Sequence, residues 1–133
     1  MPIDVAWDDE TCTIIRYTFT TPWTWNDYRQ AIDRGWVLAG EVDHPTDSIT
    51  DMSQSRLWPD GIFNNIRKSV VEIPDTTQSV VLVGGGMFVE MAISVLRRVY
   101  RSPGARFLTA KSVDEARQLI HRRRDELTRS DRS

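Results

Sequence analysis

The run from Ser79 to Val83 constrains the fold of this chain more than any other segment. It reads Ser-Val-Val-Leu-Val, without alternation between apolar and polar positions, and the glycines Gly84, Gly85 and Gly86 end it. A strand that is apolar on both faces is typical of the interior of a parallel sheet against which helices pack. The segment therefore predicts a central, buried strand in an α/β fold.

Strand and helix signals on either side of this run predict the order of the elements. Segments rich in β-branched and aromatic residues predict strands at 3–7, 13–19, 48–52, 79–83 and 106–109. Thr24 with Asp27, and Ser112 with Glu115, have the spacing of helix-capping boxes. Two further helices are expected, one from Asp60 and one after the glycines. The order β-β-α-β-α-β-α-β-α predicts a mixed sheet of about five strands with four helices, beginning with an antiparallel hairpin.

Apolar residues at spacings of three and four predict which face of each helix is buried. In the first helix this stripe comprises Trp25, Tyr28, Ile32, Trp36, Ala39 and Val42, and in the third it comprises Phe88, Met91, Ala92, Val95, Leu96 and Val99. Both tryptophans of the first helix are therefore expected in the core.

The length of 133 residues fits one domain, which we expect to span residues 1–125, with a frayed polar tail at 126–133. Cys12 is the only cysteine, so no internal disulfide forms. No run approaches the roughly 20 apolar residues of a membrane span, and no signal peptide is visible. The expected location is the cytoplasm.

The charge and the motifs of the sequence argue against several classes of function. The net charge of −2 points to no particular partner, although arginine is in excess after residue 60. Nucleic acid is not expected as a partner, because no aromatic residues interleave these arginines and no recognition motif occurs. No His or Cys spacing fits a zinc site, and no Ser-His-Asp arrangement is present. We therefore expect neither a catalytic residue nor a metal nor a cofactor.

Polar residues and glycines gather at the predicted ends of two successive parallel strands. Asp51 and Ser53 follow one strand and Gly84 to Gly86 the next, so they are expected to line one crevice. Glycine amides before a helix can hold an anion, and carboxylates such as Asp51 and Asp60 can hold Mg²⁺ or transfer protons. Turn and cap chemistry explains the same residues without any function, and both interpretations stay open.

Four segments carry a resemblance to a known family. Ile49–Ser53 is a strand ending in Asp-x-Ser, and Ser79–Val83 is the next core strand. Arg106–Ala110 is a short strand, and Ser112–Ala116 opens a helix as Ser-x-x-Glu-Ala. Together they resemble the SpoIIAA-like fold of STAS domains and anti-sigma-factor antagonists, over almost the whole chain. The resemblance implies a non-enzymatic regulatory or protein-interaction module. The SEC14-like domains, a related group with this general topology, bind lipids.

One stretch departs from the antagonists of that family. They carry a phosphorylatable Ser at the start of the second helix, whereas residues 56–62 here read Arg-Leu-Trp-Pro-Asp-Gly-Ile and contain no hydroxyl. We therefore expect no kinase-controlled switch between Trp58 and Ile62. A regulated phosphate on Ser53 or Ser55 would restore the switch in a shifted form.

Two functions follow from these observations. The first is a protein-interaction module that binds an unidentified protein through the surface from Ser53 to Ile66, where Trp58 and Phe63 bring large apolar rings. A second copy of the chain is a further candidate partner. The alternative is a domain that binds a small anionic or lipid-like ligand at the crevice of the strand ends. A deep apolar pocket would favour the ligand, and a flat apolar surface around Trp58 would favour the partner, unless that ring only caps the core edge.

Overall fold

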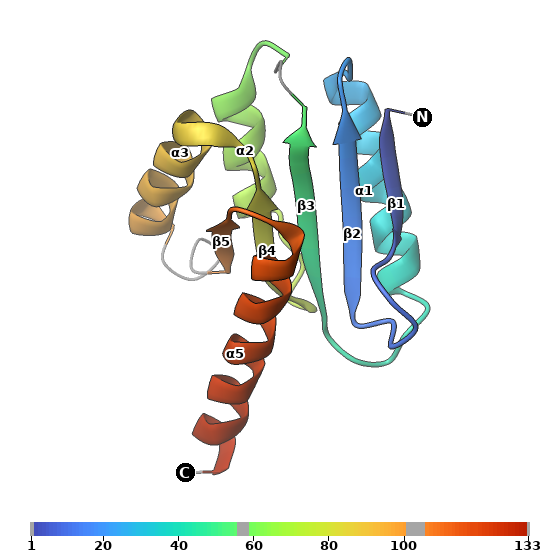
Figure 1. Ribbon diagram of the computed structural model, residues 1–133, viewed down its shortest axis with the longest axis vertical. Helices are drawn as coiled ribbons and strands as arrows, with labels where there is room; N and C mark the ends of the chain where they lie inside the picture. Colours follow the sequence, from blue (N-terminus) through green and yellow to red (C-terminus); the bar gives the residue numbers. More distant parts are fainter. Residues whose placement is uncertain (1, 56–58, 101–105, 133) are drawn as a thin grey trace.

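The computed structural model describes residues 2–55, 59–100 and 106–132, and the predicted order of elements is confirmed (Figure 1). The elements are β1 (Ile3–Trp7), β2 (Ile14–Thr20), α1 (Trp25–Ala39), β3 (Thr46–Gln54), α2 (Ile62–Val71), β4 (Thr77–Val83), α3 (Gly86–Val99), β5 (Phe107–Ala110) and α5 (Val113–Arg132). The capping box of α1 forms, because the Thr24 side chain accepts from the Asp27 amide and the Asp27 carboxylate accepts from the Thr24 amide. Helix α5 includes residues 126–132, the segment expected to be a frayed tail.

The five strands form one mixed sheet in which spatial order follows chain order. Strands β1 and β2 form the predicted antiparallel hairpin, and the other neighbouring pairs are parallel. Strand β4 lies between β3 and β5, so the apolar run from Ser79 to Val83 lies in the interior of the sheet as predicted.

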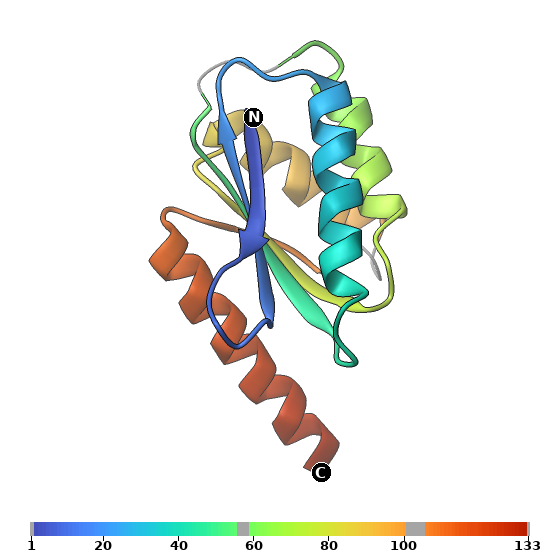
Figure 2. The ribbon, with the colours of Figure 1, turned by 90° about the vertical axis from the view of Figure 1, so that its right-hand side faces the viewer.

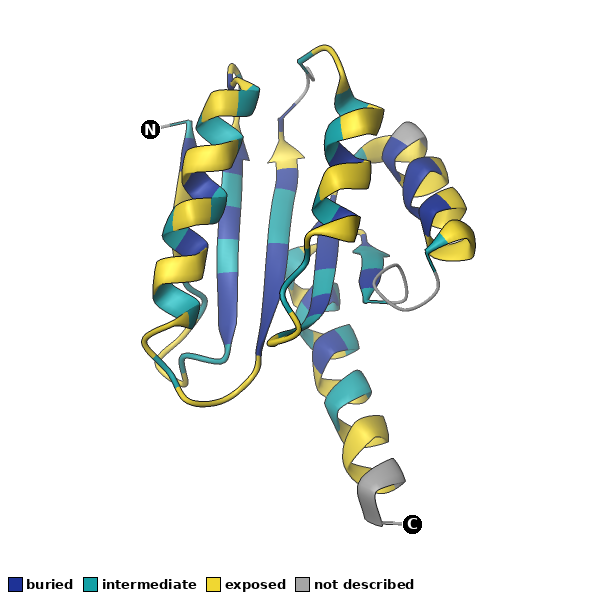
Figure 3. Ribbon diagram, turned by 180° about the vertical axis from the view of Figure 1, so that it is seen from behind, coloured by how far each residue is buried: buried dark blue, intermediate teal, exposed yellow. Residues whose placement is uncertain are grey.

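The helices lie in two layers around the sheet (Figure 2). Helices α1, α2 and α3 cover one face with the larger apolar core, and α5 covers the other face with a smaller one. The second half of α5 extends past the end of the sheet and is largely exposed (Figure 3). Within residues 2–55, 59–100 and 106–132, no helix is both long enough and apolar enough to cross a membrane.

The predicted buried faces of two helices are wrong in part. In α3, Ala92 and Leu96 of the predicted stripe are buried together with Val89 and Ile93, whereas Met91, Val95 and Val99 are exposed. The side chain of Phe88 lies outside the described part of the chain. Apolar residues surround most of this helix, so their spacing does not determine which face is covered. In α1, Ala31 and Gly35 are the fully buried residues, and Trp36 departs from the prediction because its side chain is 49% exposed. The other predicted residues of that helix pack against the core, namely Trp25, Tyr28, Ile32 and Ala39.

Ion pairs fasten α5 to its face of the sheet. The Asp8 carboxylate, whose side chain is 2% exposed, accepts two hydrogen bonds from Arg117 of α5 and one from Arg16 of β2. The equally buried Asp47 of β3 accepts from Nε of Arg124 at 2.8 Å. These carboxylates lie on the sheet side and two of their cations lie on the helix, so the contacts fix the position of α5.

Candidate functional site

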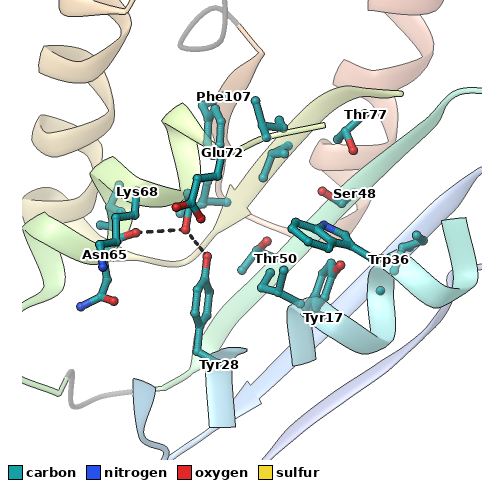
Figure 4. A pocket seen from close by; sticks show the side chains of 18 of the residues that line it. Tyr17, Tyr28, Trp36, Ser48, Thr50, Asn65, Lys68, Glu72, Thr77 and Phe107 are labelled. Carbon is teal, nitrogen blue, oxygen red and sulfur yellow. Dashed lines mark hydrogen bonds between the residues drawn. The ribbon is translucent and has the colours of Figure 1, made fainter. Parts of the chain in front are cut away.

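A cleft of about 420 Å³ lies between α1 and α2, above the middle of the sheet (Figure 4). Its walls are the facing sides of the two helices, and its floor consists of side chains from β2, β3, β4 and β5. Most of the lining is apolar and comes from residues of the larger core, such as Ile15, Met52, Leu82 and Phe107. The core on this side of the sheet is therefore incompletely filled.

A row of hydroxyl groups runs along the floor of the cleft. Thr46, Ser48 and Thr50 alternate along β3 and all three line the cleft. On the neighbouring strand, Tyr17 stands beside Thr50 in the register of β2 and β3. Interior strands of parallel sheets usually carry apolar residues at such positions, so this hydroxyl row is a departure from ordinary core packing.

The floor hydroxyls have no protein partner among the described residues and open onto the cleft, although the residues that carry them are largely buried. Tyr17 is 7% exposed and Ser48 is 8% exposed. No hydrogen bond joins the hydroxyls of Tyr17, Ser48 or Thr50 to another residue in the described part of the chain. Burial raises the pKa of the Tyr17 phenol, so the group stays protonated and uncharged near neutral pH. The floor therefore presents uncharged hydrogen-bonding groups that face the cleft.

Glycine at position 35 makes room for Tyr17. A Cβ atom there would lie 1.7 Å from the Tyr17 hydroxyl oxygen, far inside van der Waals contact. Gly35 is buried in the middle of α1, where glycine is otherwise unfavourable. The pair thus explains why the tyrosine side chain reaches under α1 toward the wall of the cleft.

A chain of hydrogen bonds joins the two walls. The hydroxyl of Tyr28 on α1 contacts the hydroxyl of Ser69 on α2, and Ser69 in turn donates to the Asn65 carbonyl at 3.0 Å (Figure 4). Because the single proton of Ser69 is used on Asn65, Tyr28 donates to Ser69. Burial raises the pKa of Tyr28 as well. This link sets the separation of α1 and α2 at one end of the cleft.

The rim of the cleft carries balanced charges. Helix α1 contributes Arg29 and Asp33, and helix α2 contributes Lys68 and Glu72. All four side chains belong to exposed residues. The half-exposed ring of Trp36 lines the α1 side of the mouth (Figure 4). Charge is therefore confined to the entrance and sums to zero there.

Several residues of the predicted crevice at the strand ends are neighbours in the structure, and Gly84 packs closely on Ser53. Asp51 pairs with Val83 across β3 and β4, and a Cβ atom on Gly84 would lie 2.8 Å from the Ser53 Cα. The Asp51 carboxylate accepts from the amide and the hydroxyl of Ser53, which forms a local turn. Position 84 requires glycine for two reasons: its φ of +71° is in the left-handed region, and a side chain there would clash with Ser53.

The other predicted site residues are scattered around this end of the sheet. Gly85 precedes α3 without a side-chain cap, and Gly86 opens the helix with a φ of +80°. Ser55 is buried and its hydroxyl accepts from the Trp23 indole at 2.7 Å, while Asp60 and Phe63 are exposed. Trp58 lies outside the described residues. None of the described site residues predicted from the sequence lines the cleft.

The cleft residues were missed by sequence reasoning, although one signal was present. Hydroxyl residues at every second position from Thr46 to Thr50 mark one face of a strand, and that face is polar where an interior strand needs apolar side chains. In the described part of the chain, no cluster of three or more His, Cys, Asp or Glu residues is arranged to hold a metal ion.

Comparisons with family models, curated proteins and solved structures found no match for this chain. Its function is therefore inferred from the residues of the cleft and their chemistry.

Proposed function

We propose that this domain binds a small, largely apolar, lipid-like molecule in the cleft between α1 and α2. The observation that carries the proposal is an apolar cleft of about 420 Å³ whose floor presents hydroxyls that open onto it without protein partners in the described part of the chain. Small-molecule sites are typically concave, about 300–1,000 Å³ in volume, and mostly apolar with a few fixed polar groups. The cleft has each of these properties.

The residues that leave the cleft open support the same conclusion. Ser48 and Thr50 on the floor are small, where Leu or Ile would fill the space. An unfilled core lowers stability, because the side chains around it lose packing contacts. A ligand that occupies the cleft would restore those contacts and satisfy the hydroxyls.

The cleft favours a lipid-like ligand over a small anion. Its only lysine and arginine among the described lining residues, Lys68 and Arg29, lie at the exposed rim and are matched by acidic residues. The glycine segment predicted to hold an anion lies at the strand ends, outside the cleft, and Gly84 packs directly on Ser53 there.

Filling the cleft provides the test. Nile red, an uncharged apolar dye that fluoresces in apolar sites, is titrated into the wild-type protein and into Ser48→Leu and Thr50→Leu. We expect both variants to lose at least tenfold in dye affinity while their melting temperatures stay equal or rise, because apolar side chains replace unpaired hydroxyls. Ser53→Leu, an exposed position on the same strand, is the matched control and should bind as the wild type does. Equal dye affinity in all four proteins would exclude the cleft as the binding site of the dye.

A second candidate function is the protein-interaction module implied by the family resemblance, and the exposed ring of Phe63 favours it. Phe63 stands on the first turn of α2 and is 42% exposed. Large exposed apolar rings are common in protein interfaces. If this surface binds a partner, Phe63→Ala should abolish capture of a defined protein from cell extract and leave the melting temperature unchanged. Val37→Ala, an exposed apolar position on α1, is the control.

A further inference from the structure

We infer that the polar end of the ligand is an uncharged oxygen acceptor, such as the carbonyl group of an ester or ketone, seated on the hydroxyl row of the cleft floor. This inference rests on the proposed ligand-binding function and names the chemistry of the ligand. It depends on three features of the cleft within the described part of the chain: hydroxyl donors without protein partners, the absence of buried charge among the lining residues, and the apolar walls.

The free donors of the floor converge where β2 and β3 lie side by side. Tyr17 and Thr50 are direct neighbours across the two strands, and Ser48 is the next residue of β3 on the same face. Each hydroxyl offers one proton, and a carbonyl oxygen accepts two hydrogen bonds. Because these hydroxyls open onto the cleft without a protein partner among the described residues, one ligand oxygen at this point would accept from two of them.

The charges of the cleft argue against a charged head group. Arg29 and Asp33 on one wall, and Lys68 and Glu72 on the other, are exposed at the rim. A carboxylate or ammonium group on the floor would lose its hydration without gaining a buried counter-ion, which costs several kcal/mol or more. The protonated phenol of Tyr17 cannot supply that charge.

The walls define the remainder of the ligand. Ile32 of α1 and Ile66 of α2 line the walls, and Leu82 and Phe107 extend the apolar floor beside the hydroxyls. Trp36 stands at the mouth (Figure 4). These surfaces accept an aliphatic or aromatic body but provide no further buried charge to orient it. The ligand is therefore expected to enter with its polar end first and to leave its apolar body between α1 and α2.

Four probes that share a ten-carbon chain test this assignment by displacing Nile red near neutral pH. They are methyl decanoate with a neutral carbonyl, decanoate with a carboxylate, decylamine with an ammonium group, and decane with no head group. We expect methyl decanoate to displace the dye at roughly a tenfold lower concentration than any of the others, which corresponds to about 1.4 kcal/mol. Tyr17→Phe and Thr50→Val should each reduce that preference several-fold and leave displacement by decane unchanged. Ser53→Ala is the matched control.

The outcomes separate this inference from the function on which it rests. If decanoate or decylamine displaces the dye as well as the ester does, the head-group assignment is wrong and ligand binding stands. The same holds if all four probes are equivalent, or if Tyr17→Phe and Thr50→Val keep the full preference for the ester. If Nile red itself does not bind the wild-type protein, both proposals fail.

Discussion

The two faces of the sheet are built on opposite plans, although they share the same five strands. Under α5, Ile49, Val81 and Ile120 are almost fully buried in a small, closed apolar core. Under α1 and α2, the core is larger but encloses a cleft with a hydroxyl floor. Strand β3 contributes to both, because Asp47 and Ile49 point to one face while Ser48 and Thr50 point to the other.

The difference indicates that one face of the sheet stabilises the domain and the other provides the proposed binding site. The α5 face gains its stability from tight packing and from ion pairs that tie the helix to the sheet. The opposite face gives up packing around the cleft. A domain that leaves a cleft unfilled for a ligand loses packing free energy there and must gain stability in another region. In this domain the closed face under α5 provides that stability.

The largest effect is expected on the closed face, from Arg124→Met. This change leaves the Asp47 carboxylate buried without its cation, and breaking such a pair typically costs about 3–5 kcal/mol. Chemical denaturation near neutral pH measures the loss. Arg122→Met, at an exposed position of the same helix, should stay within about 0.5 kcal/mol of the wild type. If Arg124→Met lowers the unfolding free energy by no more than Arg122→Met does, the ion pair of Arg124 with Asp47 does not stabilise the closed face.

A smaller loss is expected from Gly35→Ala on the open face. The new Cβ atom would clash with the Tyr17 hydroxyl, and overpacking of this kind costs about 1–3 kcal/mol. Removal of that hydroxyl in the double variant Gly35→Ala with Tyr17→Phe should recover part of the loss. Gly40→Ala is the control, since its Cβ would meet only ordinary contacts at 3.5 Å. Thermal melts of the set would disprove the steric account if the double variant is no more stable than Gly35→Ala.

The third prediction concerns how the stabilising effect of Asp8 on the closed face depends on pH. The Arg117 guanidinium lowers the pKa of Asp8 in the folded chain, so between the folded and unfolded pKa values the unfolded chain binds more protons. The contribution of Asp8 to stability is therefore full above the ordinary carboxyl pKa of 3.8 and is lost as the pH falls below it. The difference in unfolding free energy between the wild type and Asp8→Asn should narrow when the pH drops from about 6 to about 3.

Asp75→Asn is the control for this pH series, because its carboxylate is fully exposed. Its difference from the wild type should stay small across the range. The pKa of Asp47 is shifted in the opposite direction from that of Asp8, because burial raises it and favours the protonated form. A difference for Asp8→Asn that widens in acid would show that Asp8 is not held as an anion by its arginines.

The smallest effect is expected from Trp36→Ala at the mouth of the cleft. The side chain is half exposed, so its loss should cost no more than about 1 kcal/mol, whereas removal of a fully buried tryptophan costs about 3–5 kcal/mol. Trp23→Ala, at a buried position, provides that reference. Equal losses from the two variants in denaturant titrations would place Trp36 in the core, as its helical spacing predicted.

Local signals in the sequence determined the order of the elements and their boundaries to within a few residues. The capping box at Thr24, the apolar run from Ser79 to Val83 and the glycine turn after it act over a few residues, and each is confirmed. The sequence also placed Asp51, Ser53 and Gly84 together, because parallel strands bring their ends to one edge. Family membership, partners and the nature of the ligand stay predictions.

Tertiary structure alone decided which helix faces are covered and where space is left. Helix α3 is apolar on most sides, and only its contact with β5 and α2 selects the buried one. The hydroxyl row of β3 is visible in the sequence, but whether it meets a filled core or an open cleft depends on the separation of α1 and α2. The contact of Tyr28 with Ser69 joins α1 to α2, and the contact of Tyr17 with Gly35 places α1 on the sheet. Both join residues far apart in the sequence, which no local pattern encodes.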